Sequence, residues 1–402
     1  MAVPSQRSPW VLVTALGIAQ IISWGSIYYA FALLIDPLSA ALHVPTSAVV
    51  GAFSAALLAT GLASAPVGWL IDRFGGRWVM TTGSLAGAAL LAVMPQVQNL
   101  VQLYAVWIGL GLVLAATLYD PAFAVLTQVF REGQRRAITA LTLFGGFAST
   151  VFWPLTQWLV ADWGWTSAVL ALAGFNLLVC APLHAIFIPA HHQPVAQAGS
   201  QPGSRLGAAL RDPLFYGIAA AFTVNALVFS AMAVHMLGLL HHKGLSLSQA
   251  AWIGALVGPM QVLGRVLEHV FLRQWPAARV GVVAIWMLPA SLALLLAPGG
   301  QVAWFIGFAL LYGMSNGVMT IVRGALPREI YGAASFGAVN GALATPVLAA
   351  RAAGPIAAAL ALAAMSETFV LAMLCALAVA SAALFTRLLA PAAAARAAAK
   401  RE

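Results

Sequence analysis

Twelve mostly apolar stretches occupy almost the whole chain, and each is close to the length that an α-helix needs to cross a membrane. A bilayer core of about 30 Å takes about 20 residues of helix, and a helix satisfies its own backbone hydrogen bonds in lipid. Only 7% of the residues are charged, against about 25% in soluble domains. The sequence therefore predicts an all-α polytopic membrane protein with 12 transmembrane helices.

The stretches form two sets of six. The first set is expected at Trp10–Leu38, Thr46–Ile71, Trp78–Val93, Leu100–Phe130, Ala137–Ala161 and Thr166–Ile188. The second set is expected at Pro213–Leu240, Ser248–Leu272, Val280–Leu296, Val302–Leu326, Ala333–Ala363 and Glu367–Leu388. These sets predict an N-terminal six-helix bundle at residues 1–188, a linker at 189–212, a C-terminal six-helix bundle at 213–390 and a tail at 391–402.

The segment between the two sets is rich in Pro, Gly, Ser and Gln and has no apolar periodicity, so we expect a flexible linker. His191 and His192 lie in it as an adjacent pair without further ligands, which favours a solvated loop over a metal site. Cys180 and Cys375 lie inside apolar stretches and are expected to be packing residues. We therefore expect no metal, no disulfide and no cofactor.

The basic residues are distributed unequally across the predicted membrane. Fifteen of the 19 Lys and Arg residues lie on the linker's side, whereas Lys243 alone lies on the opposite side. The positive-inside rule then places the linker and both termini in the cytoplasm. The net charge of +9 follows from this topology and does not indicate a nucleic-acid partner. The first stretch is too long for a signal peptide, so we expect an uncleaved membrane helix there.

A charged segment lies between the second and third stretches and reads Gly68-Trp-Leu-Ile-Asp72-Arg73-Phe-Gly75-Gly76-Arg77. Two of its glycines are expected to allow a tight turn, and its aspartate is expected to cap or pair. The pattern resembles the loop between helices 2 and 3 of the major facilitator superfamily, which usually carries a further basic residue where this chain has Gly76. A degraded copy runs from Gly264 to Glu268 after the eighth stretch, so the two halves look like a repeat.

This resemblance implies two pseudo-symmetric six-helix bundles with a substrate cavity between them, and a secondary transporter that works by alternating access. It also implies a monomer. The charged segment would be a gate that stabilises the outward-open state by pairing with a helix end of the other half. The gating residues are then Gly68, Asp72, Arg73, Gly75, Arg77 and Glu268.

Two residues are candidates for proton coupling. Asp120 lies within the fourth stretch directly before Pro121, which is expected to bend the helix. Removal from water favours the protonated form of a carboxyl group, as a proton carrier requires, and the alternative is an ion pair with an arginine. His235 lies toward the outer end of the seventh stretch and titrates near neutral pH, and the alternative is a packing histidine.

Three arginines lie within the stretches. Arg265 and Arg323 are near stretch ends, so we expect them to extend toward the lipid headgroups, with a structural or gating role favoured over substrate contact. Arg351 lies well inside the eleventh stretch. A charge at that depth is costly and predicts an interior-facing group that binds an anion or relays protons. The alternative is a buried pair that holds helices together.

Other polar residues in the stretches complete the predicted substrate site. They are Tyr28, Asn225, Gln261 and Asn316. The alternative for the amides is that they join helices to one another. Gly313-Met-Ser315-Asn-Gly317 matches the nucleophile-elbow pattern, but it lies in a predicted membrane helix, so we expect no enzyme activity. The sequence also contains no Walker A motif for ATP.

Together these patterns predict a secondary active transporter that couples a small organic anion to protons. Its partners would be the substrate, protons and the lipid bilayer. The first two stretches resemble bacterial monocarboxylate-porter relatives, which implies the inner membrane of a bacterium. One alternative is a proton-driven efflux pump for a drug or toxic compound, and another is a non-transporting membrane receptor or scaffold.

Overall fold

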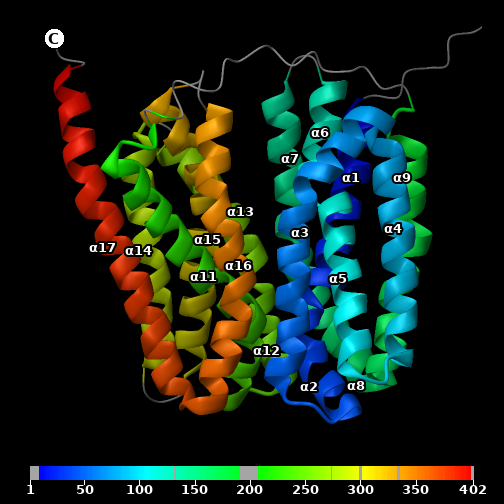
Figure 1. Cartoon of the computed structure of the whole chain (residues 1–402). Helices are drawn as coiled ribbons and strands as arrows, with labels where there is room; N and C mark the ends of the chain where they lie inside the picture. Colours follow the sequence, from blue (N-terminus) through cyan, green and yellow to red (C-terminus); the bar gives the residue numbers. More distant parts are fainter. Residues whose placement is uncertain are drawn as a thin grey trace, which may run out of the picture. The chain divides into compact units, whose positions relative to one another are not determined.

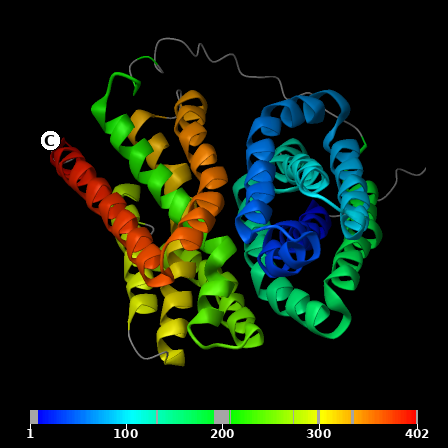
Figure 2. The ribbon, with the colours of Figure 1, turned by 60° about the horizontal axis from the view of Figure 1, so that its bottom comes forward.

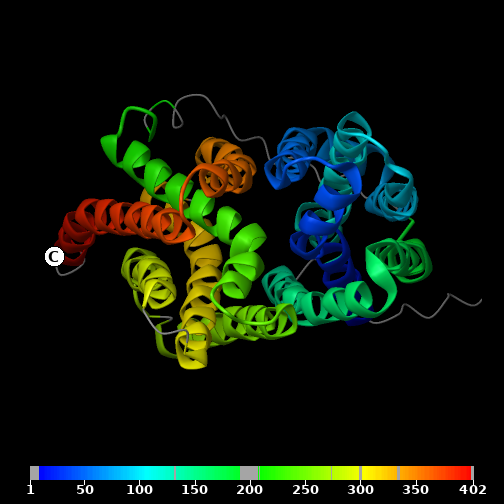
Figure 3. The ribbon, with the colours of Figure 1, turned by 90° about the horizontal axis from the view of Figure 1, so that it is seen from below.

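The computed structural model of the protein describes residues 9–130, 133–190, 207, 209–272, 274–297, 301–332 and 336–399. The chain divides into two compact units, Met1–Ala196 and Gln197–Glu402. Within each unit the helices pack side by side (Figures 1, 2 and 3), and no β-strand occurs among the described residues. The predicted histidine pair at 191 and 192 lies outside them.

The first unit is built from α-helices that are interrupted by short 3₁₀ and π segments. In chain order they are α1 (Pro9–Ser23), η1 (Trp24–Tyr29), α2 (Phe31–Leu42), α3 (Thr46–Phe74), α4 (Gly76–Val93), η2 (Met94–Gln96), α5 (Leu100–Thr117), α6 (Tyr119–Val129), α7 (Gln134–Gly146), α8 (Ala148–Phe175), η3 (Asn176–Cys180) and α9 (Ala181–Phe187). Helix α3 packs on α5, and α4 packs on α5 and α8.

The second unit has fewer interruptions. Its elements are α11 (Pro213–His242), α12 (Leu247–Ala255), α13 (Val257–Leu267), η4 (Glu268–Leu272), α14 (Ala277–Leu296), α15 (Val302–Tyr331), α16 (Phe336–Ala364) and α17 (Glu367–Ala399). Helix α11 packs on α16 and α17, and α15 packs on α13 and α14. Helix α17 continues to Ala399, beyond the expected end of the last membrane stretch.

Eleven segments of the described chain are long and apolar enough to span a membrane. One of them, Arg136–Phe187, has 52 residues and covers both the fifth and the sixth predicted stretches. A single crossing takes about 20 residues, so this segment holds two. Gly164, with φ 76° and ψ 161°, breaks the helical backbone between them. The segment therefore supplies two of the 12 predicted crossings.

Polar side chains begin several helices by accepting hydrogen bonds from backbone N–H groups that lack partners within the helix. Asn99 caps α5 through the N–H of Gln102 at 3.0 Å. Asp212 caps α11 through the N–H of Leu214 at 2.9 Å. These residues stop one membrane helix from running into the next.

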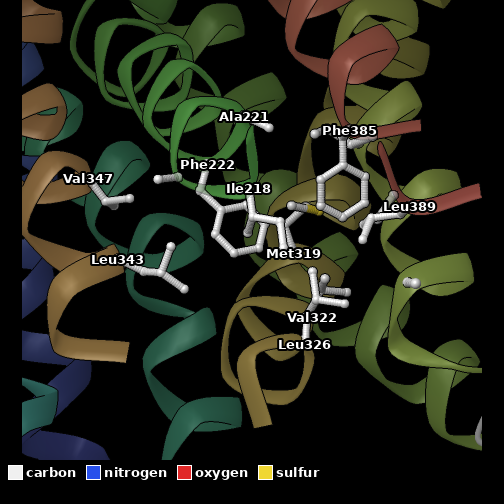
Figure 4. Packing of buried hydrophobic residues seen from close by; sticks show 14 of the residues in the cluster. Ile218, Ala221, Phe222, Met319, Val322, Leu326, Leu343, Val347, Phe385 and Leu389 are labelled. Atoms are coloured by element: carbon white, nitrogen blue, oxygen red, sulfur yellow. The ribbon is translucent and has the colours of Figure 1, made fainter. Parts of the chain in front are cut away.

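Apolar packing fills the interior of each unit. In the second unit Phe222, Met319 and Phe385 meet in one buried cluster (Figure 4) that joins α11, α15 and α17. Large apolar side chains are also exposed, such as Leu62 at 72% and Val101 at 80%. Such a surface suits the hydrocarbon core of a bilayer. Lipid chains make no hydrogen bonds, so an apolar side chain disturbs none there, as it would in water.

Candidate functional site

The charged segment of the first unit is almost entirely helical. Residues 68–74 form the last turns of α3, and α4 begins at Gly76. Gly75 alone joins the two helices, with φ 83° and ψ 149°, and its N–H donates to the carbonyl of Ile71 at 2.9 Å. The tight turn expected from the glycines is formed at Gly75, directly before Gly76, the first residue of α4, whereas Gly68 lies within α3 with open space around it.

The charged side chains of this segment point away from the core. Asp72 and Arg73 are exposed, and the Arg73 guanidinium lies over the rings of Trp69 and Phe74 at 5.3 and 5.5 Å. Arg77 is half-buried. No ion-pair partner for Asp72 occurs in the part of the chain that the structure describes. Glu268, the second-unit counterpart, begins the π segment η4 and is half-buried.

The fourth predicted stretch is broken rather than bent. Helix α5 ends at Thr117, Leu118 is extended, and α6 begins at Tyr119. The expected bend at Pro121 is thus corrected: this proline lies in the first turn of a new helix, where its missing N–H costs nothing. Asp120 is exposed in that same turn. The N-terminal end of a helix favours negative charge there.

Gln20 is a residue that the sequence reasoning missed. It is fully buried in α1, and its Nε2 donates to the carbonyl of Thr117 at 2.8 Å. That carbonyl ends α5, so Gln20 stabilises the break directly before Asp120. The sequence signal for this residue was that Gln20 is a single amide in an otherwise apolar part of the first stretch.

Tyr28 lies in the π segment η1, within an aromatic cluster of the first unit. Its ring contacts Trp24, Tyr29 and Phe53 with centroid distances of 5.2, 5.2 and 5.4 Å. Trp24 also contacts Tyr119 at 5.4 Å, which connects the cluster to the first turn of α6. The structure therefore places Tyr28 and Asp120 in the same region of one unit.

The second unit brings together Asn225 and two arginines. Asn225 is fully buried on α11, and its Oδ1 accepts a hydrogen bond from Nη2 of Arg323 on α15 at 3.0 Å. Arg351 on α16 is exposed and lies within electrostatic range of Arg323. The expectation that Arg323 extends to the headgroups is wrong, because its Nε is buried and its Nη2 is held by Asn225.

Contacts directly after Arg351 fix how α16 lies on α11. A Cβ at Gly354 would be 2.5 Å from the carbonyl oxygen of Leu227, so the backbones touch there. His235 donates from Nε2 to the carbonyl of Pro355 at 3.0 Å. Pro355 has no N–H, so the carbonyl of Arg351 lacks its usual helix partner. The two helices thus hold Arg351 at one position relative to Asn225.

Gln261 and Asn316 lie on the neighbouring helices α13 and α15. Gln261 is 6% exposed, and its Nε2 has no acceptor among the described groups. Asn316 is half-buried. The nucleophile-elbow pattern beside them is part of α15, and Ser315 donates to the carbonyl of Ala284 at 2.7 Å. The pattern thus lies within a helix, as expected from the sequence, and its serine contacts a neighbouring helix.

The glycines of that pattern allow α15 to touch α13. A Cβ at Gly317 would lie 2.3 Å from the carbonyl oxygen of Gln261, so Gly317→Ala should force the helices apart and cost about 1–3 kcal/mol. Gly324 on the same helix has open space, so Gly324→Ala should be neutral or stabilising by up to about 1 kcal/mol. Thermal unfolding of the purified variants compares them. Equal melting temperatures would contradict the close contact.

No group of three or more His, Cys, Asp or Glu side chains placed to hold a metal occurs in the part of the chain that the structure describes. The candidate groups of each unit are hydrogen-bonding and charged side chains. The second unit presents two guanidinium groups and one amide, and the first unit presents a carboxyl group at a helix N-terminus.

Residues 16–355 match the model of the Major Facilitator Superfamily. Monocarboxylate transporter 13 of Bos taurus is 24% identical over 277 residues, which are 66% of this chain and 63% of that protein. The chain thus spans less than two thirds of that relative's length. The uncharacterized MFS-type transporter YcxA of Bacillus subtilis (strain 168) is 24% identical over 352 residues, which are 80% of each protein.

Two solved structures share the fold. The nucleoside transporter NupG has a TM-score of 0.75 and 14% identity, with 95% of this chain and 99% of that chain covered. A bacterial homolog of the human lysosomal transporter Spinster, inward-facing and unoccupied, has a TM-score of 0.74 and 13% identity, with 95% and 98% covered. These likenesses confirm the predicted all-α membrane fold.

Proposed function

Because this chain belongs to the major facilitator superfamily, and is thus a membrane transporter and not an enzyme, we propose that it carries small organic anions coupled to protons. One observation carries the choice of substrate. Arg323, which Asn225 on α11 holds, and Arg351, on the helix that packs against α11, both lie in segments long and apolar enough to span a membrane. Arginine matches the geometry of a carboxylate, and a charge within a membrane helix is costly and usually marks a functional site.

The relatives support an anionic substrate. The Bos taurus relative is named a monocarboxylate transporter. Substrate contacts are proposed for Arg351, Asn225, Gln261 and Asn316 in the second unit and for Tyr28 in the first. The carrier would act as a monomer by alternating access.

Proton coupling is assigned first to Asp120. Its carboxyl group is exposed in the first turn of α6, so the structure shows it open to protons rather than removed from water as expected. In the proposed cycle its exposure to water would change between states, and the carboxyl group would gain and lose a proton with that change. His235 is the second candidate for proton coupling, and its hydrogen bond to Pro355 gives it a positioning role as well.

We place the protein in the inner membrane of a bacterium, and the excess of arginine on one side supports an orientation with both termini in the cytoplasm. In this orientation the segment from Gly68 to Arg77 faces the cytoplasm. We assign it the gating role that the resemblance implies, in which it stabilises one of the alternating states.

The proposal is tested with the purified protein in proteoliposomes that contain a pH-sensitive dye. A panel of small carboxylates and lipophilic cations is added outside. Acidification of the lumen that depends on a carboxylate supports anion and proton symport. Movement of protons driven only by lipophilic cations would overturn it in favour of an efflux pump, for which the aromatic cluster around Trp24 and Tyr28 is the supporting observation. No response to any compound would favour a receptor or scaffold.

Substitutions at Gly75 and Gly68 should affect different properties, the stability of the protein at Gly75 and the rate of transport at Gly68. Gly75→Ala should lower the stability of the protein by about 1–3 kcal/mol, because its backbone conformation is nearly exclusive to glycine. A Cβ at Gly68 would meet no atom within 4 Å in the described chain, so the melting temperature of Gly68→Leu should stay near the wild-type value while the initial rate of transport falls. Melting curves and uptake rates of both variants provide the check. A wild-type rate for Gly68→Leu would remove Gly68 from the gate.

A further inference from the structure

Two arginines of the second unit, Arg323 and Arg351, lie near Asn225. Arg323 on α15 is held by its hydrogen bond to Asn225 on α11, and Arg351 on α16 lies one turn before Gly354, whose backbone touches that of Leu227 on α11. Both lie within segments that span the membrane. Two neighbouring guanidinium groups repel each other, and a bound anion offsets that repulsion. This arrangement therefore favours the binding of negative charge at the same place.

The second unit does not supply that charge from the interior of its helices. The sequence of this half contains five acidic residues, Asp212, Glu268, Glu329, Glu367 and Glu402. Glu402 lies outside the described residues. Asp212 caps α11, Glu329 accepts a hydrogen bond from the N–H of Ala277 at 2.8 Å, and Glu367 pairs with His242. Glu268 begins η4, in the last turns of its span.

The amide of Asn225 is oriented by the arginine. A guanidinium only donates hydrogen bonds, so the amide oxygen must face Nη2 of Arg323 and the amide nitrogen must point elsewhere. Nδ2 of Asn225 and Nε of Arg323 are both buried without an acceptor among the described groups. The site thus has an excess of donors as well as an excess of positive charge.

We propose that Arg323 and Arg351 together bind a small dicarboxylate, with one carboxylate at each guanidinium and Asn225 as the residue that positions Arg323. A monocarboxylate would compensate only one of the two charges. The two guanidinium groups come from different helices, so each can bind one carboxylate through its own pair of donors. This inference rests on the proposed transport of organic anions and narrows the substrate class.

The experiment measures counterflow into proteoliposomes, which requires no proton gradient. Labelled dicarboxylates of two to six carbons are compared with monocarboxylates of equal length, and inorganic phosphate is added as a competitor. The wild type should prefer dicarboxylates by roughly tenfold or more in kcat/KM. Arg323→Gln should lower kcat/KM for dicarboxylates by about 100-fold while monocarboxylates change only a few-fold.

Asn225→Asp is the second variant and keeps the hydrogen bond to Arg323. It adds one negative charge at the amide, so it should remove the preference for dicarboxylates and leave monocarboxylate counterflow in place. Arg279→Gln, an exposed arginine at the start of α14, should behave as the wild type.

The outcomes separate the two proposals. Three results would overturn the dicarboxylate site and leave anion transport standing. They are an equal loss of both anion classes in Arg323→Gln, a wild-type preference for monocarboxylates, and competition by phosphate that is as strong as competition by dicarboxylates. Counterflow of lipophilic cations without any carboxylate would overturn both. A dicarboxylate preference that Arg323→Gln and Asn225→Asp each abolish would establish the site.

Discussion

Replacing Arg351 by glutamine is expected to lower kcat/KM for every transported carboxylate by at least about 100-fold. Arg351 lies near the middle of α16, whose 29 residues place both ends far from it. Its side chain is exposed while that of Arg323 is half-buried, so it offers the more accessible charge for an arriving anion. Glutamine retains much of the size and removes the charge.

Two further variants sharpen this result. Arg351→Lys keeps the charge but loses the planar pair of donors, so we expect a loss of roughly tenfold. Arg279→Gln removes a charge of the same type at an exposed helix start and should have no effect. Initial uptake rates in proteoliposomes, corrected for the amount of inserted protein, provide the measurement. Carboxylate uptake near the wild-type rate in Arg351→Gln would refute the assignment.

Replacing Asp120 by asparagine is expected to separate counterflow from accumulation. Without a membrane potential, a gradient of one pH unit sustains about tenfold accumulation for each coupled proton. If Asp120 carries the proton, Asp120→Asn should bring the accumulation ratio to about one while counterflow continues. Asparagine keeps the shape, and the contact of Gln20 with the carbonyl of Thr117 is untouched, so the break at Leu118 should remain.

His235→Gln is the matched comparison. Glutamine retains an N–H donor for the carbonyl of Pro355, but it does not titrate. Proton-driven accumulation should therefore persist in this variant if Asp120 alone carries the proton. Loss of accumulation in His235→Gln, with normal accumulation in Asp120→Asn, would assign the role of proton carrier to His235 instead of Asp120.

Much of the fold was predictable because membrane helices are specified by local composition. The second, seventh and tenth stretches agree with α3, α11 and α15 at their starts. The break at Leu118 was not predictable in the same way. Proline gives the same local signal in a bent helix and at the start of a new one. The contact from Gln20, almost a hundred residues earlier, stabilises the second arrangement.

The candidate site shows the same limit. Depth along a helix singled out Arg351, and that estimate needs only the position of the helix ends. The same estimate placed Arg323 at the headgroups, because a residue count contains no information about which neighbour a side chain meets. Asn225 lies on another helix, and its amide oxygen holds the guanidinium inside the unit. Side-chain partners across helices depend on rotation and packing, which composition does not encode.

The absence of acidic residues from the helix interiors of the second unit, within the described chain, has an electrical consequence. Two guanidinium groups act as fixed positive charge in the field across the membrane. An elementary charge that crosses a potential of 100 mV changes its energy by about 2.3 kcal/mol. In the proposed dicarboxylate carrier, the membrane potential would act on this unit when it is empty, whereas a doubly charged ligand would cancel that force. Voltage would then influence the return of the empty carrier more than the loaded step.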